Sequence, residues 1–584
     1  MSGSKLRQRR KNLKDPKGPQ YKEEEETPPE FDFDLGIYFK WPALPVLLAL
    51  GVAYYLNPKI FHDAIQSYTG LSDVEMSRVL AGPEVPVDFS ADLMKRDAIV
   101  RAFQHAWSAY ERDAMGDDEY HPLTGEGTNL TAAGGIGYTV VDSIDTMLLM
   151  GLDQEYLRAR EWVATKMSFE RNATFNTFET TIRVLGGLLS AYHLSGNDSL
   201  YLEKATELAD RIVPVFKTPS GLPLTNVNLA LREGAVDPGW PDFVSSAEVA
   251  TLQLELRYLS VLTGNSIYWE KGETVMRNLK SVLMPHGLAS IFLNWQTGEF
   301  VLSAVRLGSR ADSYYEYLLK QYLQTNSTEV FYRDMYTNAM DAVHKHLIKK
   351  ECELKYERDQ HGKTTWRLTP KQDHLVCFFG GSLLLGATTA GALVHPVSIP
   401  PKPEELSEAG QRDWKTGINL IKTCMDTHNT ATGLAPEIVH FRIASDGMGH
   451  DSMFPDDWYI KGAHIRPGEL PPYDSRYMLR PETIESLFLA FRLTGNEKYR
   501  NWAWQIFQAI EQHCRVESGG YATIINVDEV PSRKEDKMET FMLVRLFLPT
   551  ASSPDASVLP LDKYVLNTEA HPLPIFDIPE DLML

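Results

Sequence analysis

"AFRLTGNEKYRNWAWQIFQAI", residues 490–510, contains the pattern that decides the fold. An apolar run ends at Gly495, a polar residue follows, and a tyrosine opens a second run whose apolar positions recur three and four residues apart. That spacing is typical of helices. A glycine suits the left-handed position that closes a helix, and Asn496 can cap the next one. The stretch therefore predicts two helices joined by a tight turn.

The same pattern occurs three more times along the chain. It reads "LLMGLDQEYLRAREWVA" around Gly151, "AYHLSGNDSLYLEKATELADRIV" around Gly196 and "YLSVLTGNSIYWEKGETVMRNL" around Gly264. Repeated helical hairpins can stack into an open solenoid or close into a ring. Their irregular spacing predicts long loops at the end opposite the glycine turns, where functional sites usually lie. We predict an all-α toroid of helical hairpins with a central cavity; the alternative is a repeat scaffold that binds proteins.

Composition narrows the classes of partner. The chain has 584 residues, 43% of them hydrophobic, and a formal net charge of −20. A nucleic-acid partner would require a basic face, so we expect none, whereas a neutral substrate or a cation is compatible with this charge. The four cysteines follow no zinc-binding spacing.

The N-terminal part differs from the rest. Residues 1–36 are basic and then acidic, and we expect a disordered, cytosolic tail. "WPALPVLLALGVAYYL", residues 41–56, is uncharged and apolar. With "IYF" before Lys40 it nears the length that a bilayer requires, which predicts a transmembrane signal anchor over 37–57. Two prolines weaken this helix, and a buried strand and turn is the alternative.

The anchor sets the expected topology. Basic residues before the apolar run favour a cytosolic N-terminus, hence a single-pass type II protein. Residues 58–94 are then a luminal stem and residues 95–584 one luminal domain. Four Asn-X-Ser/Thr sequons support a luminal body, at Asn129, Asn172, Asn197 and Asn326.

Three acids are associated with the predicted helices. Glu179 lies in "FETTIRV", four residues before Arg183; Asp312 lies in "GSRADSYYEYLL"; Glu482 lies in "LRPETIES". Taken singly, each suits a helix cap or a surface ion pair. Acids beside aromatic residues on several helix ends that face one cavity suit glycoside hydrolysis, which needs one carboxyl group as acid and another as base or nucleophile.

Ordered motifs along nearly the whole predicted luminal domain carry a family resemblance. They include "GYTVVDSIDTMLLMGL", "GSRADSYYEYLLKQ", "HLVCFFGG", "GLAPEIVHF", "YMLRPETIESLFLAFRLTGN" and "YVLNTEAHPLPI". On these motifs the chain resembles the class I α-1,2-mannosidases of glycoside hydrolase family 47, and within it the endoplasmic-reticulum branch of fungi. The resemblance implies an (αα)₇ barrel that holds Ca²⁺ in its core and hydrolyses high-mannose N-glycans with inversion.

The resemblance also implies roles for individual residues. Glu482 matches the base that activates water, and Glu179 and Asp312 are both candidates for the general acid, which the sequence does not rank. Thr568 matches the residue that binds calcium through its carbonyl and hydroxyl oxygens. Positions that match substrate contacts or their supports are Arg183, Glu248, Arg310, His374, Arg480, Glu485, Phe541 and Glu569. For His374, a satisfied core histidine is the alternative.

Two further matches concern specificity and cysteines. An arginine before "ADS" is a feature of the endoplasmic-reticulum branch, so Arg310 is expected to favour removal of one specific mannose, because a guanidinium can engage several hydroxyls. Cys377 and Cys424 match the disulfide pair of the family. We expect Cys352 and Cys514 to be free thiols.

The sequence departs from the family after Val544. "RLFLPTASSPD" follows where the family continues a long helix, so roughly two helical turns are absent, and Arg545 stands near a missing glutamate. Two functions are therefore weighed. The first is a calcium-dependent mannosidase of the endoplasmic reticulum or early Golgi that trims Man₉GlcNAc₂ to Man₈GlcNAc₂. The second is a mannose-binding, degradation-enhancing relative with little or no turnover.

Overall fold

The computed structural model describes residues 88–282, 288–348, 353–358, 364–442, 457–462, 469–543 and 558–582. The chain divides into two compact units, Met1–Pro86 and Val87–Leu584. The predicted tail, anchor and most of the stem lie outside the described residues. In the described part of the chain, no helix is both long and apolar enough to cross a membrane.

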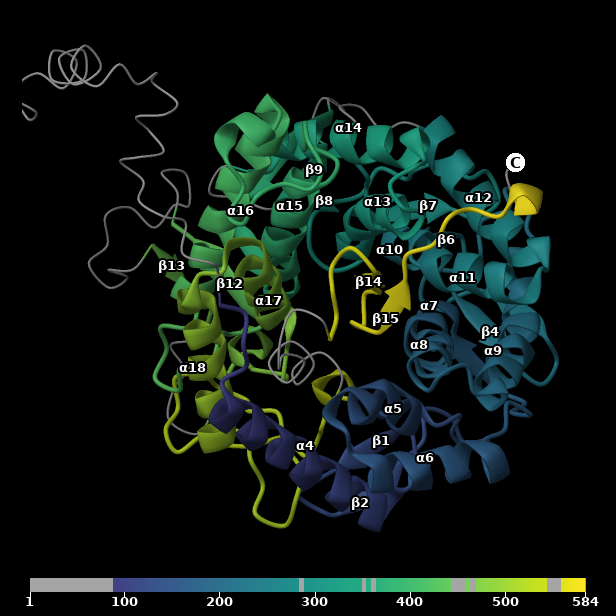
Figure 1. Cartoon of the computed structure of the whole chain (residues 1–584), viewed down its shortest axis with the longest axis vertical. Helices are drawn as coiled ribbons and strands as arrows, with labels where there is room; N and C mark the ends of the chain where they lie inside the picture. The colour runs from purple at the N-terminus through teal and green to yellow at the C-terminus, as the bar shows by residue number, and fades with distance from the viewer. Residues whose placement is uncertain are drawn as a thin grey trace, which may run out of the picture. The chain divides into compact units, whose positions relative to one another are not determined.

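In the described part of the second unit, six helical hairpins follow one another after α4 (Leu93–Ala114). They are α5 (Tyr138–Met150) with α6 (Asp153–Thr165), α8 (Gly186–Leu194) with α9 (Ser199–Ile212), α11 (Gln253–Thr263) with α12 (Ser266–Ser281), α13 (Asp312–Gln324) with α14 (Val330–His346), α15 (Phe378–Thr388) with α16 (Glu408–Asp426), and α17 (Glu482–Thr494) with α18 (Glu497–His513). The first helix of each hairpin contacts the first helix of the next, from α5 to α17. These six form an inner row, and their partners lie outside it (Figure 1).

The four predicted glycine turns are confirmed. The glycines that close them have φ values of +69°, +77°, +67° and +65°, at Gly151, Gly196, Gly264 and Gly495. The Asn496 side chain accepts a hydrogen bond from the backbone N–H of Lys498 at 3.0 Å, so it caps α18 as expected. At α6 the cap position is Leu152, which has no capping oxygen.

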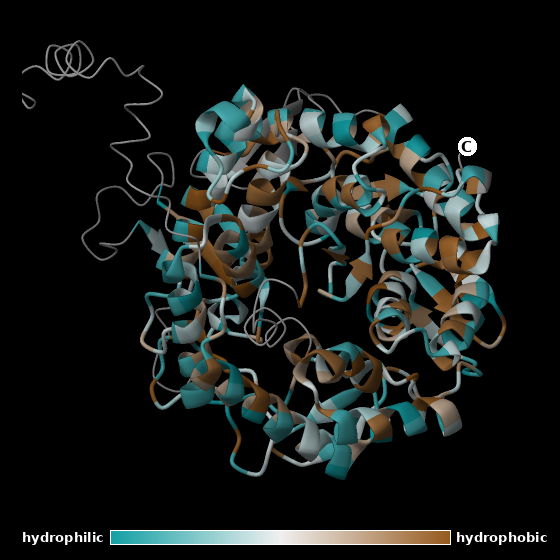
Figure 2. Cartoon of the chain, in the orientation of Figure 1, coloured by the Kyte–Doolittle hydropathy of each residue, from teal (hydrophilic) through white to brown (hydrophobic). Residues whose placement is uncertain are grey.

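Burial separates the inner helices from the outer ones. Every residue of α15 is buried, as is every residue of α13 after Asp312. Outer helices such as α16 and α18 bury one face and expose charged residues on the other, which Figure 2 shows as hydrophilic colour on the outside. α15 is apolar on all sides, as a helix covered on all sides usually is. α13 differs because it buries charged residues, among them Glu316 and Lys320.

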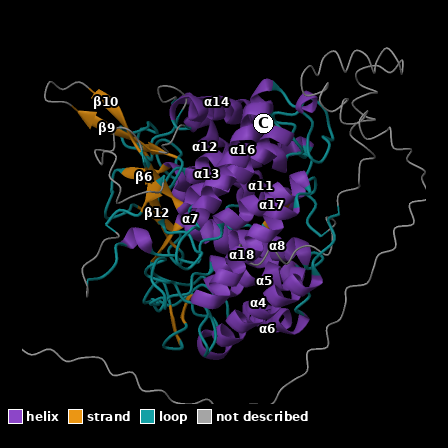
Figure 3. Cartoon of the chain, turned by 90° about the vertical axis from the view of Figure 1, so that its left-hand side faces the viewer, coloured by secondary structure: helices purple, strands orange, loops and turns teal. Residues whose placement is uncertain are grey.

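Short antiparallel strands lie at the end of the inner helices opposite the glycine turns (Figure 3). They are β1 (Glu119–His121), β2 (Glu126–Thr128), β3 (Thr174–Asn176), β4 (Asn226–Asn228), β5 (Glu233–Ala235), β6 (Phe243–Ser245), β7 (Phe292–Asn294), β8 (Val305–Arg306), β9 (Glu353–Arg358), β10 (Thr364–Thr369), β11 (Lys371–Asp373), β12 (Ile438–Phe441) and β13 (Trp458–Tyr459). They belong to the long loops that the irregular repeat predicts.

A C-terminal hairpin closes the chain. Strands β14 (Tyr564–Leu566) and β15 (Pro572–Pro574) pair with each other and contact α8, α11 and α13, inside the row of inner helices (Figure 1). The turn between the strands brings residues 567–571 into the centre of the helical unit.

The last described helical turn lies beside α5. Residues 541–543 are helical, and the hydroxyl of Thr540 donates to Asp142 Oδ2 at 2.5 Å. The chain then leaves the described range at Val544. The predicted loss of two helical turns falls on residues 544–557, which lie outside the described residues.

Candidate active site

The three predicted acids lie where inner helices begin. Asp312 is the first residue of α13 and Glu482 the first of α17. Glu179 ends α7 (Thr177–Glu179) and leads into the π-helical turn η1 (Thr180–Leu185), which continues as α8. Carboxylates are stabilised at helix N-termini, and π-turns are frequent at functional sites. Because each of these inner helices runs toward a turn at its other end, the three acids share the strand end of the helical unit.

Arg183 connects Glu179 with the C-terminal hairpin. Its Nε donates to Glu179 Oε2 at 2.7 Å, so the predicted pairing of these residues across one helical turn is confirmed. Its NH2 lies 3.1 Å from Glu569 Oε1, and its guanidinium lies 5.6 Å from the centre of the Phe541 ring. The Arg183 side chain is only 13% exposed. Four predicted site residues are therefore in direct contact.

Thr568 lies beside buried carboxylates. Its hydroxyl donates to Glu316 Oε2 at 2.8 Å. Lys320 Nζ forms an ion pair with Glu316 and lies 3.4 Å from Glu485 Oε1. The structure thus joins Thr568 to Glu485 through Glu316 and Lys320, neither of which was predicted as a site residue.

The oxygen atoms around Thr568 suit a hard cation. Ca²⁺ takes oxygen ligands, which hydroxyl, carbonyl and carboxylate groups supply here. Within the described part of the chain, no three His, Cys, Asp or Glu side chains are grouped closely enough to hold a metal ion. The resemblance implies a cation held by the two oxygens of Thr568 together with water or sugar hydroxyls.

Asp312 is in an environment that favours its neutral form. Desolvation by burial raises the pKa of its carboxyl group to about 7, and the nearby negative charges of Glu316, Asp373 and Glu482 act in the same direction. The backbone N–H of Ser313 donates to Asp312 Oδ1 at 3.0 Å and opposes the shift. Asp312 can therefore keep a proton near neutral pH.

Glu482 is buried beside a charged pair. It is 3% exposed. Arg480, two residues earlier, donates through Nε and NH2 to both oxygens of Glu437, at 3.0 and 2.8 Å, and its guanidinium lies 5.6 Å from the Phe541 ring centre. Glu437 was missed as a site residue, although it lies in the quoted motif "GLAPEIVHF". The sequence feature that could have identified Glu437 is that it is an acidic residue inside a quoted motif in which no residue had been given a role.

His374 lies next to the first turn of α17. Its Nε2 is 3.0 Å from the hydroxyl of Thr483, the residue after Glu482. Burial holds the pKa of His374 well below its usual value, with His428 and Arg480 adding to the effect, so the imidazole is neutral. The residue is buried, as the core alternative requires, and it also contacts the helix turn that carries Glu482.

The cysteines agree with the prediction where they are described. Cys377 and Cys424 form a disulfide. Cys514 is free and buried. Cys352 lies outside the described residues.

Arg310 and Glu248 occupy one side of the site. The Arg310 guanidinium carbon lies 5.2 Å from the centre of the Phe292 ring. Glu248, in α10 (Ser246–Ala250), accepts a hydrogen bond from Asn176 Nδ2 at 3.4 Å. Burial raises the pKa of Glu248, and the charge of Arg310 lowers it. The structure therefore places these two residues close enough to interact electrostatically.

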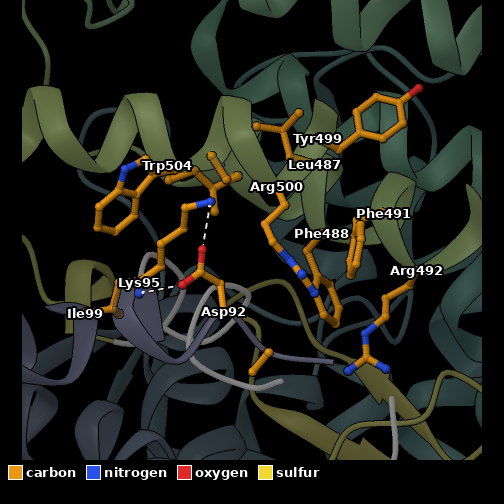
Figure 4. Close-up of a pocket in the computed structure, with 13 residues that line it drawn as sticks. Asp92, Lys95, Ile99, Leu487, Phe488, Phe491, Arg492, Tyr499, Arg500 and Trp504 are labelled. Atoms are coloured by element: carbon orange, nitrogen blue, oxygen red, sulfur yellow. Dashed lines mark hydrogen bonds and ion pairs between the residues drawn. The ribbon is translucent and has the colours of Figure 1, made fainter. Parts of the chain in front are cut away.

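A pocket between α4, α17 and α18 is separate from this site (Figure 4). Its walls are mostly apolar, for example Leu487, Phe488 and Phe491, and Lys95 pairs with Asp92 at its edge. None of the predicted site residues lines it.

Buried carboxylates gathered at one end of the inner helices, with raised pKa values at Asp312, Glu248 and Glu437, suit a glycoside hydrolase. Comparison with known proteins identifies the family. The model of glycosyl hydrolase family 47 matches residues 102–575, and the chain belongs to that family.

Its relatives have named activities. The chain is 41% identical over 513 residues to a mannosyl-oligosaccharide 1,2-alpha-mannosidase of Arabidopsis thaliana, covering 82% of this chain and 79% of the relative. It is 38% identical to the endoplasmic reticulum mannosyl-oligosaccharide 1,2-alpha-mannosidase of Schizosaccharomyces pombe, covering 84% and 91%. The solved alpha-1,2-mannosidase from Trichoderma reesei superposes with a TM-score of 0.68 at 27% identity, covering 83% of this chain and all of that one.

Proposed function

We propose that the chain is a calcium-dependent, inverting α-1,2-mannosidase that removes one mannose from Man₉GlcNAc₂. The observation that carries the proposal is the pairing of Asp312, which can hold a proton near pH 7, with the buried Glu482 in one electrostatic cluster. The relatives at about 40% identity are named 1,2-alpha-mannosidases, and these names support an α-1,2 linkage as the bond that is cleaved and mannose as the sugar that is released.

In the proposed reaction, Asp312 donates its proton to the glycosidic oxygen as the bond to the anomeric carbon breaks. Glu482 accepts a proton from the water molecule whose oxygen forms the new bond from the opposite face, so the configuration inverts. The raised pKa of Asp312 supports it as the acid. Glu179 is ion-paired with Arg183, and we assign it to positioning the sugar or the water.

Calcium is part of the proposal. Thr568 would hold Ca²⁺ through its hydroxyl and carbonyl oxygens, with the carboxylates of Glu316, Glu485 and Glu569 adding negative charge nearby. When bound, the cation would orient sugar hydroxyls through direct coordination. Arg310, Glu248, Arg480, Phe541 and His374 would contact the glycan or support residues that do.

We also propose the finer points of the architecture and the location. The helical turn at residues 541–543 and helix α4 would form the seventh pair of an (αα)₇ barrel. The apolar run over 37–57 would anchor the protein as a single-pass type II protein, with the barrel in the lumen of the endoplasmic reticulum or early Golgi. Its partners there would be high-mannose N-glycans on glycoproteins, which links it to glycoprotein quality control.

The test is incubation of the purified full chain with Man₉GlcNAc₂, with calcium and with EDTA, followed by proton NMR. We expect calcium-dependent release of β-mannose that stops after one residue. Release of α-mannose would refute inversion. Glycan binding without release would refute the enzyme and favour the mannose-binding alternative.

A further inference from the structure

The Arg310 side chain is held in an unusual way. Its guanidinium carbon lies 5.2 Å from the centre of the Phe292 ring. Among the described residues, no hydrogen bond or ion pair of this side chain accompanies that contact. An arginine that is held by a ring face keeps its five N–H donors available, whereas an arginine held by a carboxylate uses them.

The backbone of Arg310 is also constrained. Its φ of +75° lies in the left-handed region, which is costly for a residue with a Cβ atom. Two hydrogen bonds hold its carbonyl oxygen, from the backbone N–H of Ala247 at 2.9 Å and the hydroxyl of Ser245 at 3.2 Å. Strained conformations persist where the surrounding structure enforces them, and they cluster at ligand-binding sites.

The same segment that holds the backbone of Arg310 also places Phe292. In the pairing of β6 with β7, Ser245 lies opposite Phe292, and β6 and β7 lie side by side near α10 and α13 (Figure 1). Phe292 is 8% exposed. The rings of Trp240 and Phe243 lie 5.1 and 6.2 Å from it. The ring beneath the guanidinium is therefore fixed by strand pairing and by packing.

A matching acceptor lies nearby. Oε2 of Glu248 is buried and has no hydrogen-bond partner among the described residues. The charges of Glu248 and Arg310 interact. Available donors on one side and an available acceptor on the other suit the hydroxyl pairs of a sugar, in which each group can donate and accept.

We propose that Phe292 is a positioning residue for glycan recognition: it presents the guanidinium of Arg310 with its donors free, and so determines which mannose arm is accepted. The proposal rests on the proposed function. It concerns binding and arm choice, because Phe292 acts through Arg310 and does not contact the reacting atoms.

The test compares Phe292→Leu with the wild type on Man₉GlcNAc₂ in calcium. We expect KM to rise about 3- to 10-fold, the range of a partly desolvated cation–π contact, with kcat within about 2-fold. The dominant Man₈GlcNAc₂ isomer should fall as a share of the product. Phe292→Tyr keeps the ring face and should behave like the wild type.

A double-mutant cycle separates positioning from packing. In an Arg310→Leu background, Phe292→Leu should change KM less than about 2-fold, because the contact is already lost. If the effect of Phe292→Leu persists at full size in that background, or if Phe292→Leu leaves both KM and arm choice unaltered, the proposal is wrong.

A third measurement avoids any change of shape. Fluorinated phenylalanines at position 292 weaken the negative ring face while keeping the ring, so KM should rise with fluorination in the wild type and stay flat with Arg310→Leu. If KM does not respond to fluorination, the proposal fails even where Phe292→Leu misfolds. The dissociation constant of Man₉GlcNAc₂, measured by calorimetry, gives the same comparison without turnover, so failure of the proposed function is distinguishable from failure of this proposal.

Discussion

Replacing Asp312 by asparagine should stabilise the protein while it strongly lowers turnover. Burial and neighbouring acids raise the pKa of Asp312 from 3.8 to about 7. The folded state therefore disfavours the charged carboxylate, and an amide of the same shape removes that cost. If Asp312 supplies the proton, kcat should fall by about 10²- to 10⁴-fold.

The size of the effect follows from the two pKa values. A shift of about 3 units corresponds to about 4 kcal/mol at high pH, where both folded and unfolded chains carry the charge. At pH 5 the folded chain is mostly protonated at Asp312, and the cost is about 1.7 kcal/mol. A raised folded pKa means that stability is present at low pH and is lost as the pH rises through about 7. The advantage of Asp312→Asn should therefore grow by about 2–3 kcal/mol between pH 5 and pH 8.

The assay is the urea midpoint and the thermal midpoint of both proteins at pH 5 and pH 8. Asp373→Asn is a matched control of opposite sign. Burial alone would raise the pKa of Asp373, but Lys371 at 2.7 Å, Arg306 and the backbone N–H of Ser309 at 3.3 Å outweigh it and lower the pKa. The charge of Asp373 therefore stabilises the fold above acidic pH, and the variant should lose stability at pH 8.

Two results would refute this reasoning. One is an Asp312→Asn protein that is no more stable than the wild type at pH 8. The other is a stability difference that does not change between pH 5 and pH 8, because the gain would then come from packing and not from ionisation.

The remaining predictions concern other parts of the site. Glu482→Gln should lower kcat by about 10²- to 10⁴-fold while the dissociation constant of Man₉GlcNAc₂ stays within about 3-fold; unchanged kcat would exclude Glu482 as the base. Arg183→Leu should cost about 3–5 kcal/mol in urea unfolding, because it leaves buried carboxylates without their cation, and a cost below about 1 kcal/mol would contradict the ion-pair network. Cys377→Ser/Cys424→Ser should lose about 2–4 kcal/mol, since the disulfide joins residues 47 positions apart; the variant's thermal midpoint should no longer respond to reductant. Calcium should raise the thermal midpoint of the wild type, and Thr568→Val should abolish that rise; an equal rise in the variant would place the cation elsewhere.

Local chemistry explains what the sequence by itself determined. The glycine turns and the Asn496 cap involve groups within one helical turn, and the pairing of Glu179 with Arg183 spans four residues. Such contacts depend on neighbours in the chain, so they can be predicted from the pattern alone. The same pattern predicted at which end of the hairpins the acids lie, because the glycine turns occupy the other end.

Contacts between distant segments were decided only by the tertiary structure. The pairing of Arg480 with Glu437 and of Arg183 with Glu569 joins segments that the hairpin pattern does not relate. The raised pKa of Asp312 depends on burial and on Glu482, which comes from another inner helix. Burial and charge separation depend on how the inner helices pack together, and no run of residues encodes them locally. The sequence therefore placed the three acids on predicted helices, and the tertiary structure raised the pKa of Asp312 to about 7.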